Sequence, residues 1–134
     1  SGNIIAKIRC ETAPSMATVR TAEESQKNII IGIGYGAKES IPEIKLLAEK
    51  LGAGIAATRK TVDNDYLPYE FQVGLTGKSV NPDVYIAFGI SGAVHHIAGM
   101  RQSGTVIAVN PDREAPIFKY ADYGIVAEVK DMFI

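Results

Sequence analysis

The sequence predicts an α/β protein with a Rossmann-like, doubly wound parallel sheet of about five to six strands and helices on both faces. Short apolar runs that do not alternate with polar residues are typical of strands buried on both faces, as at 28–34, 84–88 and 105–109. Helical spacing of apolar residues lies between such runs. Strands that alternate with helices are joined in parallel through right-handed crossovers, and ligands of such sheets bind at the carboxyl ends of the strands.

The first half of the chain is predicted to hold two strands and one helix. Residues 28–34 form the first strand, which ends in glycines. Pro42 begins a helix, and Gly52 is its expected C-cap. The second strand occupies 54–58 and ends at Arg59.

The second half is predicted to hold three strands and a helix. Residues 60–83 are polar and irregular, and a loop of this length in a compact domain is usually functional. A strand at 84–88, a helix at 91–102 and a strand at 105–109 follow, and the last strand is expected at 124–129.

The N-terminal part reads as edge structure. Residues 4–21 are expected to form two short edge strands around Pro14, and residues 1–3 resemble a vector-derived remnant. Residues 4–134 are then one domain. Cys10 is the single cysteine, which excludes an internal disulfide and a cysteine metal cluster and favours a reducing, cytoplasmic location.

Composition narrows the function further. The 134 residues are 46% apolar and 22% charged, as in ordinary globular proteins. A net charge of -1 gives no reason to expect nucleic acid or an anionic membrane as a partner. No apolar run reaches the roughly 18–20 residues of a membrane span, so membrane insertion is not expected.

The strand at 84–88 turns directly into the next predicted helix through a Gly-Ile-Ser-Gly sequence. A helix that begins there points unpaired N–H groups at the space above the sheet, which favours a phosphate or pyrophosphate cradle. Ser91 adds a hydroxyl, Gly92 permits close approach of a ligand, and His95 and His96 follow within one turn. Arg59 and Asn110 follow other strands, so one shared pocket is expected.

Several more specific interpretations of the sequence have weaker support. The turn at 32–36 has G-x-G-x-G spacing, which leaves a phosphate loop and a plain tight turn both open. Residues 74–78 lack P-loop spacing, and the adjacent His95 and His96 cannot chelate one metal, so no metal site is expected. Ser91 lacks a nucleophile elbow and no paired carboxylates bracket a pocket. These features favour a cofactor-binding domain without catalytic residues.

Five motifs resemble the electron transfer flavoprotein alpha subunit, specifically its C-terminal FAD-binding domain. They occur in the family's order over about residues 4–130, without the family's N-terminal domain: PSMATVR at 14–20, RKTVD at 59–63, QVGLTGK at 72–78, ISGAVHHIAGM at 90–100 and APIFKYADYGIV at 115–126.

The resemblance implies that FAD binds in an extended form across the strand ends. It places Arg59 against the flavin ring, Thr76 at flavin N5 and His96 near the C2 carbonyl. It places Ser91 and Gly92 at the pyrophosphate. The other implied contacts are Asn110 and Glu128 at the adenosine end, Gln72 and Val73 at the flavin, and Tyr35, Thr58, Gly74, Gly77, Ala93 and His95.

The sequence departs from the family pattern at four positions. Tyr35 stands where many members have a phosphate-binding arginine, and Leu75 replaces a glutamine. Glu128 replaces an aspartate, and His95 replaces a frequent glutamine and adds a titratable group near the flavin. These departures imply an FAD affinity or potential that differs from the typical member.

The expected function is therefore an electron carrier rather than an enzyme. The resemblance implies an electron transfer flavoprotein beta subunit as partner, flavin dehydrogenases as electron donors, and a membrane or soluble acceptor. The alternative is a non-redox module that binds AMP, NAD or a CoA fragment. Hydride transfer through NAD is disfavoured because no acidic residue follows the second strand.

Overall fold

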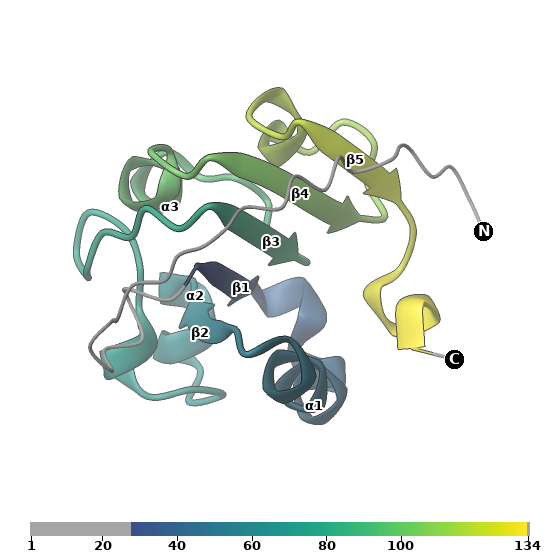
Figure 1. Ribbon diagram of the computed structural model, residues 1–134, viewed down its shortest axis with the longest axis horizontal. Coiled ribbons are helices and arrows are strands. Elements are labelled where there is room, and N and C mark those ends of the chain that lie inside the picture. The colour runs from purple at the N-terminus through teal and green to yellow at the C-terminus, as the bar shows by residue number, and fades with distance from the viewer. Residues whose placement is uncertain (1–27, 134) are drawn as a thin grey trace.

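A computed structural model describes residues 28–133, which form a single five-stranded, fully parallel sheet in the order β2-β1-β3-β4-β5 (Figure 1). The chain leaves β1 toward β2 and then crosses over to β3 on the other side of β1, so the strand order reverses between β1 and β3. The predicted α/β fold is confirmed. The strands are β1 Ile29–Ile33, β2 Gly54–Ala57, β3 Val84–Phe88, β4 Thr105–Asn110 and β5 Tyr123–Val126.

In residues 28–133, three α-helices and three 3-10 helices connect these strands, and a fourth 3-10 helix follows β5. The 3-10 helices are short and follow or precede the longer elements. The α-helices are α1 Ile41–Leu51, α2 Arg59–Asp63 and α3 Val94–Met100, and the 3-10 helices are Tyr35–Ser40, Tyr69–Phe71, Pro116–Lys119 and Val129–Phe133.

Both faces of the sheet are covered, as the uninterrupted apolar strands predict. On one face Ile97 and Met100 of α3 pack with the fully buried Tyr85 of β3. On the other face Ile44 of α1 packs with Ile33 of β1. Within β1, Ile30 belongs to the first core and Ile31 to the second, so alternate residues of one strand supply two separate cores, as in a doubly wound sheet.

The ends of α1 follow the expected sequence signals. Pro42 is its second residue, where a missing N–H costs nothing. Gly52 caps the C-terminus at φ 67°, and its N–H donates to the carbonyl of Glu49 at 3.3 Å. This prediction is confirmed.

Three predicted boundaries are wrong. The segment 60–83 is not wholly irregular, because Thr58 caps α2 by accepting from the Thr61 N–H at 3.4 Å. The helix predicted at 91–102 is shorter, because Gly92 at φ 97° interrupts helical geometry before α3. The last strand is also shorter than 124–129, since Val129–Phe133 folds as a 3-10 helix.

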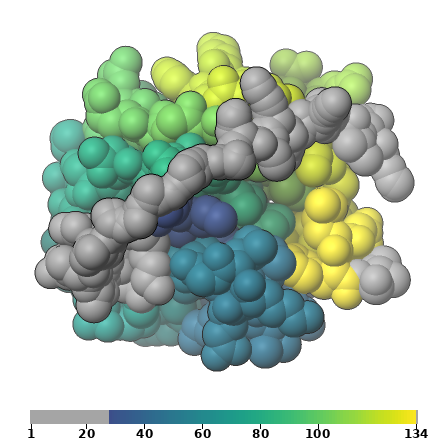
Figure 2. All heavy atoms as spheres, in the orientation of Figure 1, coloured from purple at the N-terminus to yellow at the C-terminus, as the bar shows by residue number. Residues whose placement is uncertain are grey.

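That C-terminal 3-10 helix closes the α1 face of the sheet. Val129 is buried there, and the Phe133 ring centroid lies 5.7 Å from that of Phe88. In Figure 2 the yellow atoms of this segment lie beside the blue atoms of the part that contains α1. Within 28–133, no helix combines the length and apolarity needed to cross a bilayer.

Four sequence-based predictions about the N-terminal part of the chain lie outside the described residues. These are the remnant at 1–3, the edge strands at 4–21, Cys10 and the 14–20 motif.

Candidate functional site

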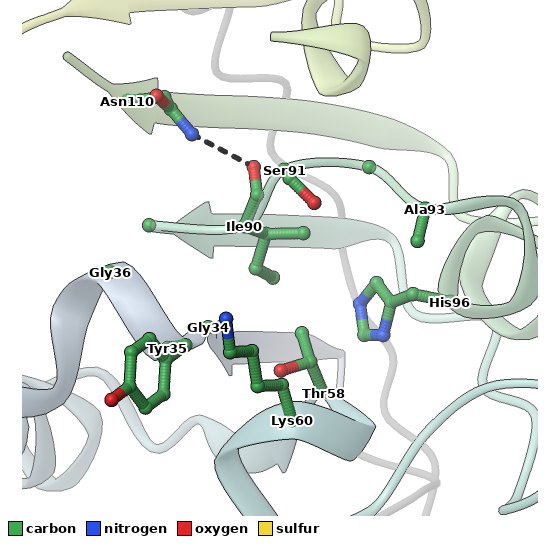
Figure 3. Close-up of a pocket in the computed structure, with 12 residues that line it drawn as sticks. Gly34, Tyr35, Gly36, Thr58, Lys60, Ile90, Ser91, Ala93, His96 and Asn110 are labelled. Atoms are coloured by element: carbon green, nitrogen blue, oxygen red, sulfur yellow. Dashed lines mark hydrogen bonds between the residues drawn. The ribbon is translucent and has the colours of Figure 1, made fainter. Parts of the chain in front are cut away.

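A cavity of about 410 Å³ opens at the carboxyl ends of four strands, beside the reversal of strand order (Figure 3). This is where ligands bind in open parallel sheets. Each wall follows a different strand: Gly34, Tyr35 and Gly36 follow β1, Thr58 and Lys60 follow β2, Gly89 to Ala93 follow β3, Asn110 ends β4, and His96 of α3 completes the lining.

The glycine turn after β1 is built against the turn after β3. The N–H of Gly34 donates to the carbonyl of Phe88 at 2.9 Å, and the N–H of Gly36 donates to that of Gly89 at 3.2 Å. A Cβ on Gly34 would lie 2.2 Å from the Gly89 carbonyl oxygen. Close backbone packing thus explains why position 34 is a glycine. Of the two interpretations of this segment, the plain tight turn accounts for this position.

Residues 91–93 lead into α3 with their backbone at the cavity. Within residues 28–133 the N–H groups of Ser91, Gly92 and Ala93 donate no hydrogen bond. Consecutive N–H groups that have no internal acceptor are able to bind an anion. These N–H groups precede α3 rather than forming its first turn, and the phosphate cradle stays a prediction.

Gly92 is required for a different reason from the one expected. A Cβ there would lie 2.4 Å from the backbone nitrogen of Ile117, and φ is 97°. The Ile117 N–H donates to the Ser91 carbonyl at 2.8 Å, which ties this segment to the neighbouring loop. Gly92 therefore permits internal packing, and this packing fixes the 91–93 backbone.

Asn110 holds the same segment from the other side. Its amide donates to the carbonyl of Ile90 at 3.0 Å, and its side-chain oxygen accepts from the Asp112 N–H at 2.8 Å. The side chain lines the cavity but both of its polar atoms have partners. Its clearest role is to position the turn after β3.

His96 is buried in a hydrogen-bonded network between α3 and β3. Its Nδ1 lies 3.0 Å from the carbonyl of Val73, so Nδ1 carries the proton. Its Nε2 therefore accepts from the hydroxyl of Tyr85 at 2.9 Å. Burial lowers the pKa of His96 to about 4, against a smaller raising effect of the Val73 hydrogen bond, and burial raises the pKa of Tyr85 above its usual value. His96 is neutral at pH 7.

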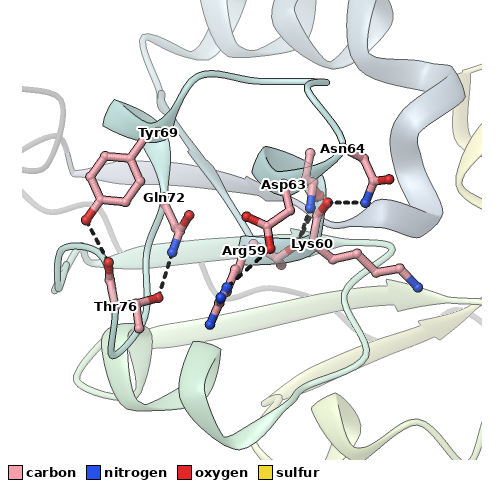
Figure 4. A network of polar contacts seen from close by, with 9 residues as sticks. Arg59, Lys60, Asp63, Asn64, Tyr69, Gln72 and Thr76 are labelled. Atoms are coloured by element: carbon pink, nitrogen blue, oxygen red, sulfur yellow. Dashed lines mark hydrogen bonds and ion pairs between the residues drawn. The ribbon is translucent and has the colours of Figure 1, made fainter.

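A second cavity of about 480 Å³ lies between α2 and α3. Arg59 and His95 line it, and Arg59 Nε lies 3.2 Å from the Asp63 carboxylate in an exposed i,i+4 pair. Lys60, Ala93 and His96 line both cavities, so the two are contiguous. Arg59 and Lys60 are neighbours in α2, yet Figure 4 shows their side chains extending in different directions.

The loop at 72–78 forms a compact unit beside the start of α3. The Gln72 amide donates to the Thr76 hydroxyl at 2.7 Å, and the Tyr69 hydroxyl donates to the Thr76 carbonyl at 2.6 Å (Figure 4). The Leu75 N–H donates to the carbonyl of His95 at 2.9 Å. The polar groups of this loop are thus engaged with one another.

The structure brings most of the predicted site residues together, though not all. Thr58, Tyr35, Ser91, Gly92, Ala93, His96 and Asn110 line the first cavity, and Arg59 and His95 line the second. Glu128 is exposed after β5 and lines neither cavity. Five more predicted residues lie in the adjacent loop and line neither cavity: Gln72, Val73, Gly74, Thr76 and Gly77.

Lys60 is the main cavity residue that the sequence analysis does not predict. A strand that ends at Arg59 singles out the Arg59 side chain alone. Because α2 begins at Arg59, the next side chain points about 100° away around the helix axis and reaches the first cavity. No cluster of three or more metal-ligating side chains is present in the described part of the chain.

Comparisons with known proteins point to one family. The family model described as the electron transfer flavoprotein FAD-binding domain matches residues 23–101. The electron transfer flavoprotein subunit alpha of Paracoccus denitrificans is 53% identical over 98 residues, which cover 73% of this chain and 32% of that protein. The Bacillus subtilis subunit is 50% identical over 107 residues, covering 78% and 33%.

A mitochondrial relative from Oryza sativa subsp. japonica, also named electron transfer flavoprotein subunit alpha, is 54% identical over 98 residues. These cover 73% of this chain and 27% of that protein, so the chain spans about a third of the length of the relatives it matches. Because the family model covers more than half of the residues and includes the glycine turn, α2 and the cradle, the chain belongs to the electron transfer flavoprotein alpha-subunit family.

Proposed function

We propose that this chain binds FAD across the two contiguous cavities and serves as the cofactor domain of an electron carrier. The observation that carries the proposal is a run of N–H groups without a hydrogen-bond partner among the described residues, at Ser91, Gly92 and Ala93, which line the first cavity. These groups suit the pyrophosphate at the centre of FAD. The family match supports the identity of the ligand, since the matched domain is described as FAD-binding.

The chemistry of the two cavities differs in a way that suits an extended dinucleotide. The first cavity lies over the sheet and has no carboxylate among the described residues that line it, which favours an anion. The second is lined by Arg59, whose side chain is 63% exposed, and by Asp63, the carboxylate with which Arg59 forms an ion pair. The exposed guanidinium would turn from this pair to a bound ring system. A cation there favours the added negative charge of a reduced ring.

Bound flavin would supply one- or two-electron redox chemistry, and the residues of this chain would bind and orient it. Arg59 would lie against the ring, while Asn110 keeps the Ile90 turn in place and the 91–93 backbone holds the phosphates. His96 is neutral, so its contribution at the ring is the shape and polarity of a fixed imidazole. No residue here is required to act as a nucleophile or general base, which agrees with a carrier.

The wider assignments rest on the family. We propose an electron transfer flavoprotein beta subunit as partner and flavin dehydrogenases as electron donors, because the relatives are named as alpha subunits. The cytoplasmic location suggested by the sequence stays a prediction, since one relative is described as mitochondrial.

The test uses a substitution that removes one N–H without disturbing the backbone. Ala93 has φ -59° and ψ 146°, which proline adopts, so Ala93→Pro removes an N–H that makes no internal bond. We expect unchanged thermal stability and roughly tenfold weaker FAD binding by titration calorimetry, while Ala93→Ser, which keeps the N–H, binds like wild type. Wild-type protein that retains no flavin absorbance after incubation with FAD and desalting would contradict the proposal.

A second candidate, a non-redox nucleotide-binding module, is favoured by one observation. Gln72 and Thr76, which the resemblance assigns to the flavin, bond to each other, and both nitrogens of His96 have protein partners. AMP or NAD binding in the absence of FAD binding would support this candidate. Calorimetry with all three ligands separates the two functions.

A further inference from the structure

Two lysines converge on the ring of Tyr35 at the edge of the first cavity. Lys38 Nζ lies 4.4 Å from the ring centroid and Lys60 Nζ lies 4.5 Å from it. Both distances are within cation–π range. The Tyr35 ring also makes an edge-on contact with the ring of Tyr66, at 6.0 Å between centroids. The two ammonium groups therefore lie within about 9 Å of each other.

Neither ammonium group is neutralised by a carboxylate of residues 28–133. In the described residues no carboxylate forms an ion pair with Lys38 or Lys60, whereas the neighbouring Arg59 is paired with Asp63. Two uncompensated cations that share one ring repel each other, and an anion placed near them relieves this repulsion. The arrangement is suited to a ligand that brings negative charge.

Only one of the two lysines reaches the cavity. Lys60 lines it together with Ser91, Gly92 and Ala93, while Lys38 is not part of the lining. Figure 3 shows the Lys60 side chain extending from α2 toward the Gly34 turn, with the Tyr35 ring beside it. Because His96 is neutral at pH 7, Lys60 is the charged group among the described residues of this cavity.

We infer that Lys60 binds the phosphate groups of the nucleotide that occupies the first cavity, opposite the N–H groups of residues 91–93, and that Tyr35 is the positioning residue that holds its side chain there. This inference rests on the proposed nucleotide-binding function and names the residue that supplies the cation. The sequence alone pointed to a loss of positive charge at position 35. In the structure, Lys60 of α2 supplies a positive charge to the same cavity.

Tyr35 acts through its ring face. A lysine side chain loses conformational entropy when it binds an anion. A lysine that already stacks on an aromatic ring has less of this entropy left to lose, so it binds the anion more tightly. The ring face is retained in Tyr35→Phe and lost in Tyr35→Leu. A role for the Tyr35 hydroxyl itself as a ligand would instead make both variants equally weak.

The experiment measures binding of FAD, ADP and adenosine to wild-type protein and variants by titration calorimetry, at low and moderate salt. Lys60→Gln is expected to weaken FAD and ADP binding roughly tenfold and to leave adenosine binding unchanged, because adenosine carries no phosphate. Lys38→Gln is the matched control: it removes the same charge from the same ring outside the cavity, and a loss of at most about twofold is expected. Tyr35→Leu should lose about threefold and Tyr35→Phe should match wild type.

Each outcome decides a different point. If wild type binds FAD or ADP but Lys60→Gln binds them equally well, the inference about Lys60 is overturned and the proposed function stands. Equal losses in Lys38→Gln and Lys60→Gln also overturn it, since they would indicate general electrostatic attraction rather than a contact. Wild-type protein that binds neither FAD nor ADP overturns the proposed function and this inference together.

Discussion

The buried histidine gives a prediction about stability as a function of pH. The pKa of His96 is lowered to about 4 in the folded chain, from 6.5 for a free histidine, because burial disfavours the charged ring. As the pH falls below 6.5, the His96 imidazole binds a proton in the unfolded chain but stays neutral in the folded chain. The stabilisation is therefore complete above pH 6.5 and is lost progressively as the pH falls toward 4.

The size of the effect follows from the two pKa values. Between pH 7 and pH 5, the unfolded state gains about 2 kcal/mol relative to the folded state from this one residue. The range avoids most carboxylate titration, which lies lower. We expect urea unfolding, followed by circular dichroism, to show this loss in wild type and in His95→Gln, whose substituted side chain is exposed. His96→Gln should lose far less across the same range.

A direct measurement complements the unfolding series. The chain has two histidines, so His95→Gln leaves a single imidazole, and its C2 proton can be titrated by NMR without assignment. A titration midpoint near 4 is expected. A midpoint near 6.5, or an equal loss of stability in wild type and His96→Gln, would refute the reasoning from burial and the Tyr85 hydrogen bond.

Two further predictions concern the turns that shape the cavity. Gly34→Ala should lower the free energy of unfolding by about 1–3 kcal/mol, because its Cβ would meet the Gly89 carbonyl oxygen at 2.2 Å; urea unfolding checks this, and a loss no larger than that of the exposed control Glu49→Ala would contradict it. Asn110→Ala should cost about 1–3 kcal/mol, since it leaves the carbonyl of Ile90 without its donor, and should also weaken FAD binding; thermal unfolding matching that of wild type would argue against this positioning role.

Much of the fold could be predicted because its signals are local. The apolar run at 28–34 specified a buried strand, and Pro42 with Gly52 marked both ends of α1. The start of α3 could not be placed, because Gly92 interrupts the helix at φ 97° where it packs against the backbone of Ile117, 25 positions later in the chain. No local pattern encodes that contact.

The candidate site, like the fold, could be predicted from the sequence only in part. Of the three residues expected to share one pocket, Ser91 and Asn110 line the same cavity, since parallel topology brings the strand ends together. Arg59 lines the second cavity instead. The sequence could not show that the side-chain amide of Asn110 donates a hydrogen bond to the carbonyl of Ile90. It also could not place Lys60 at the cavity, because that depends on the direction in which α2 presents consecutive side chains.

The contiguity of the two cavities has a consequence for the motions of the protein. The walls they share come from α2 and α3, helices of five and seven residues that are too short to be stable by themselves. Local opening of either helix would release part of any ligand that spans both cavities, so occupancy would couple two otherwise separate opening equilibria. A bound dinucleotide would then act as a tether within the fold, slowing amide hydrogen exchange in Arg59–Asp63 and Val94–Met100 together while leaving α1 unchanged.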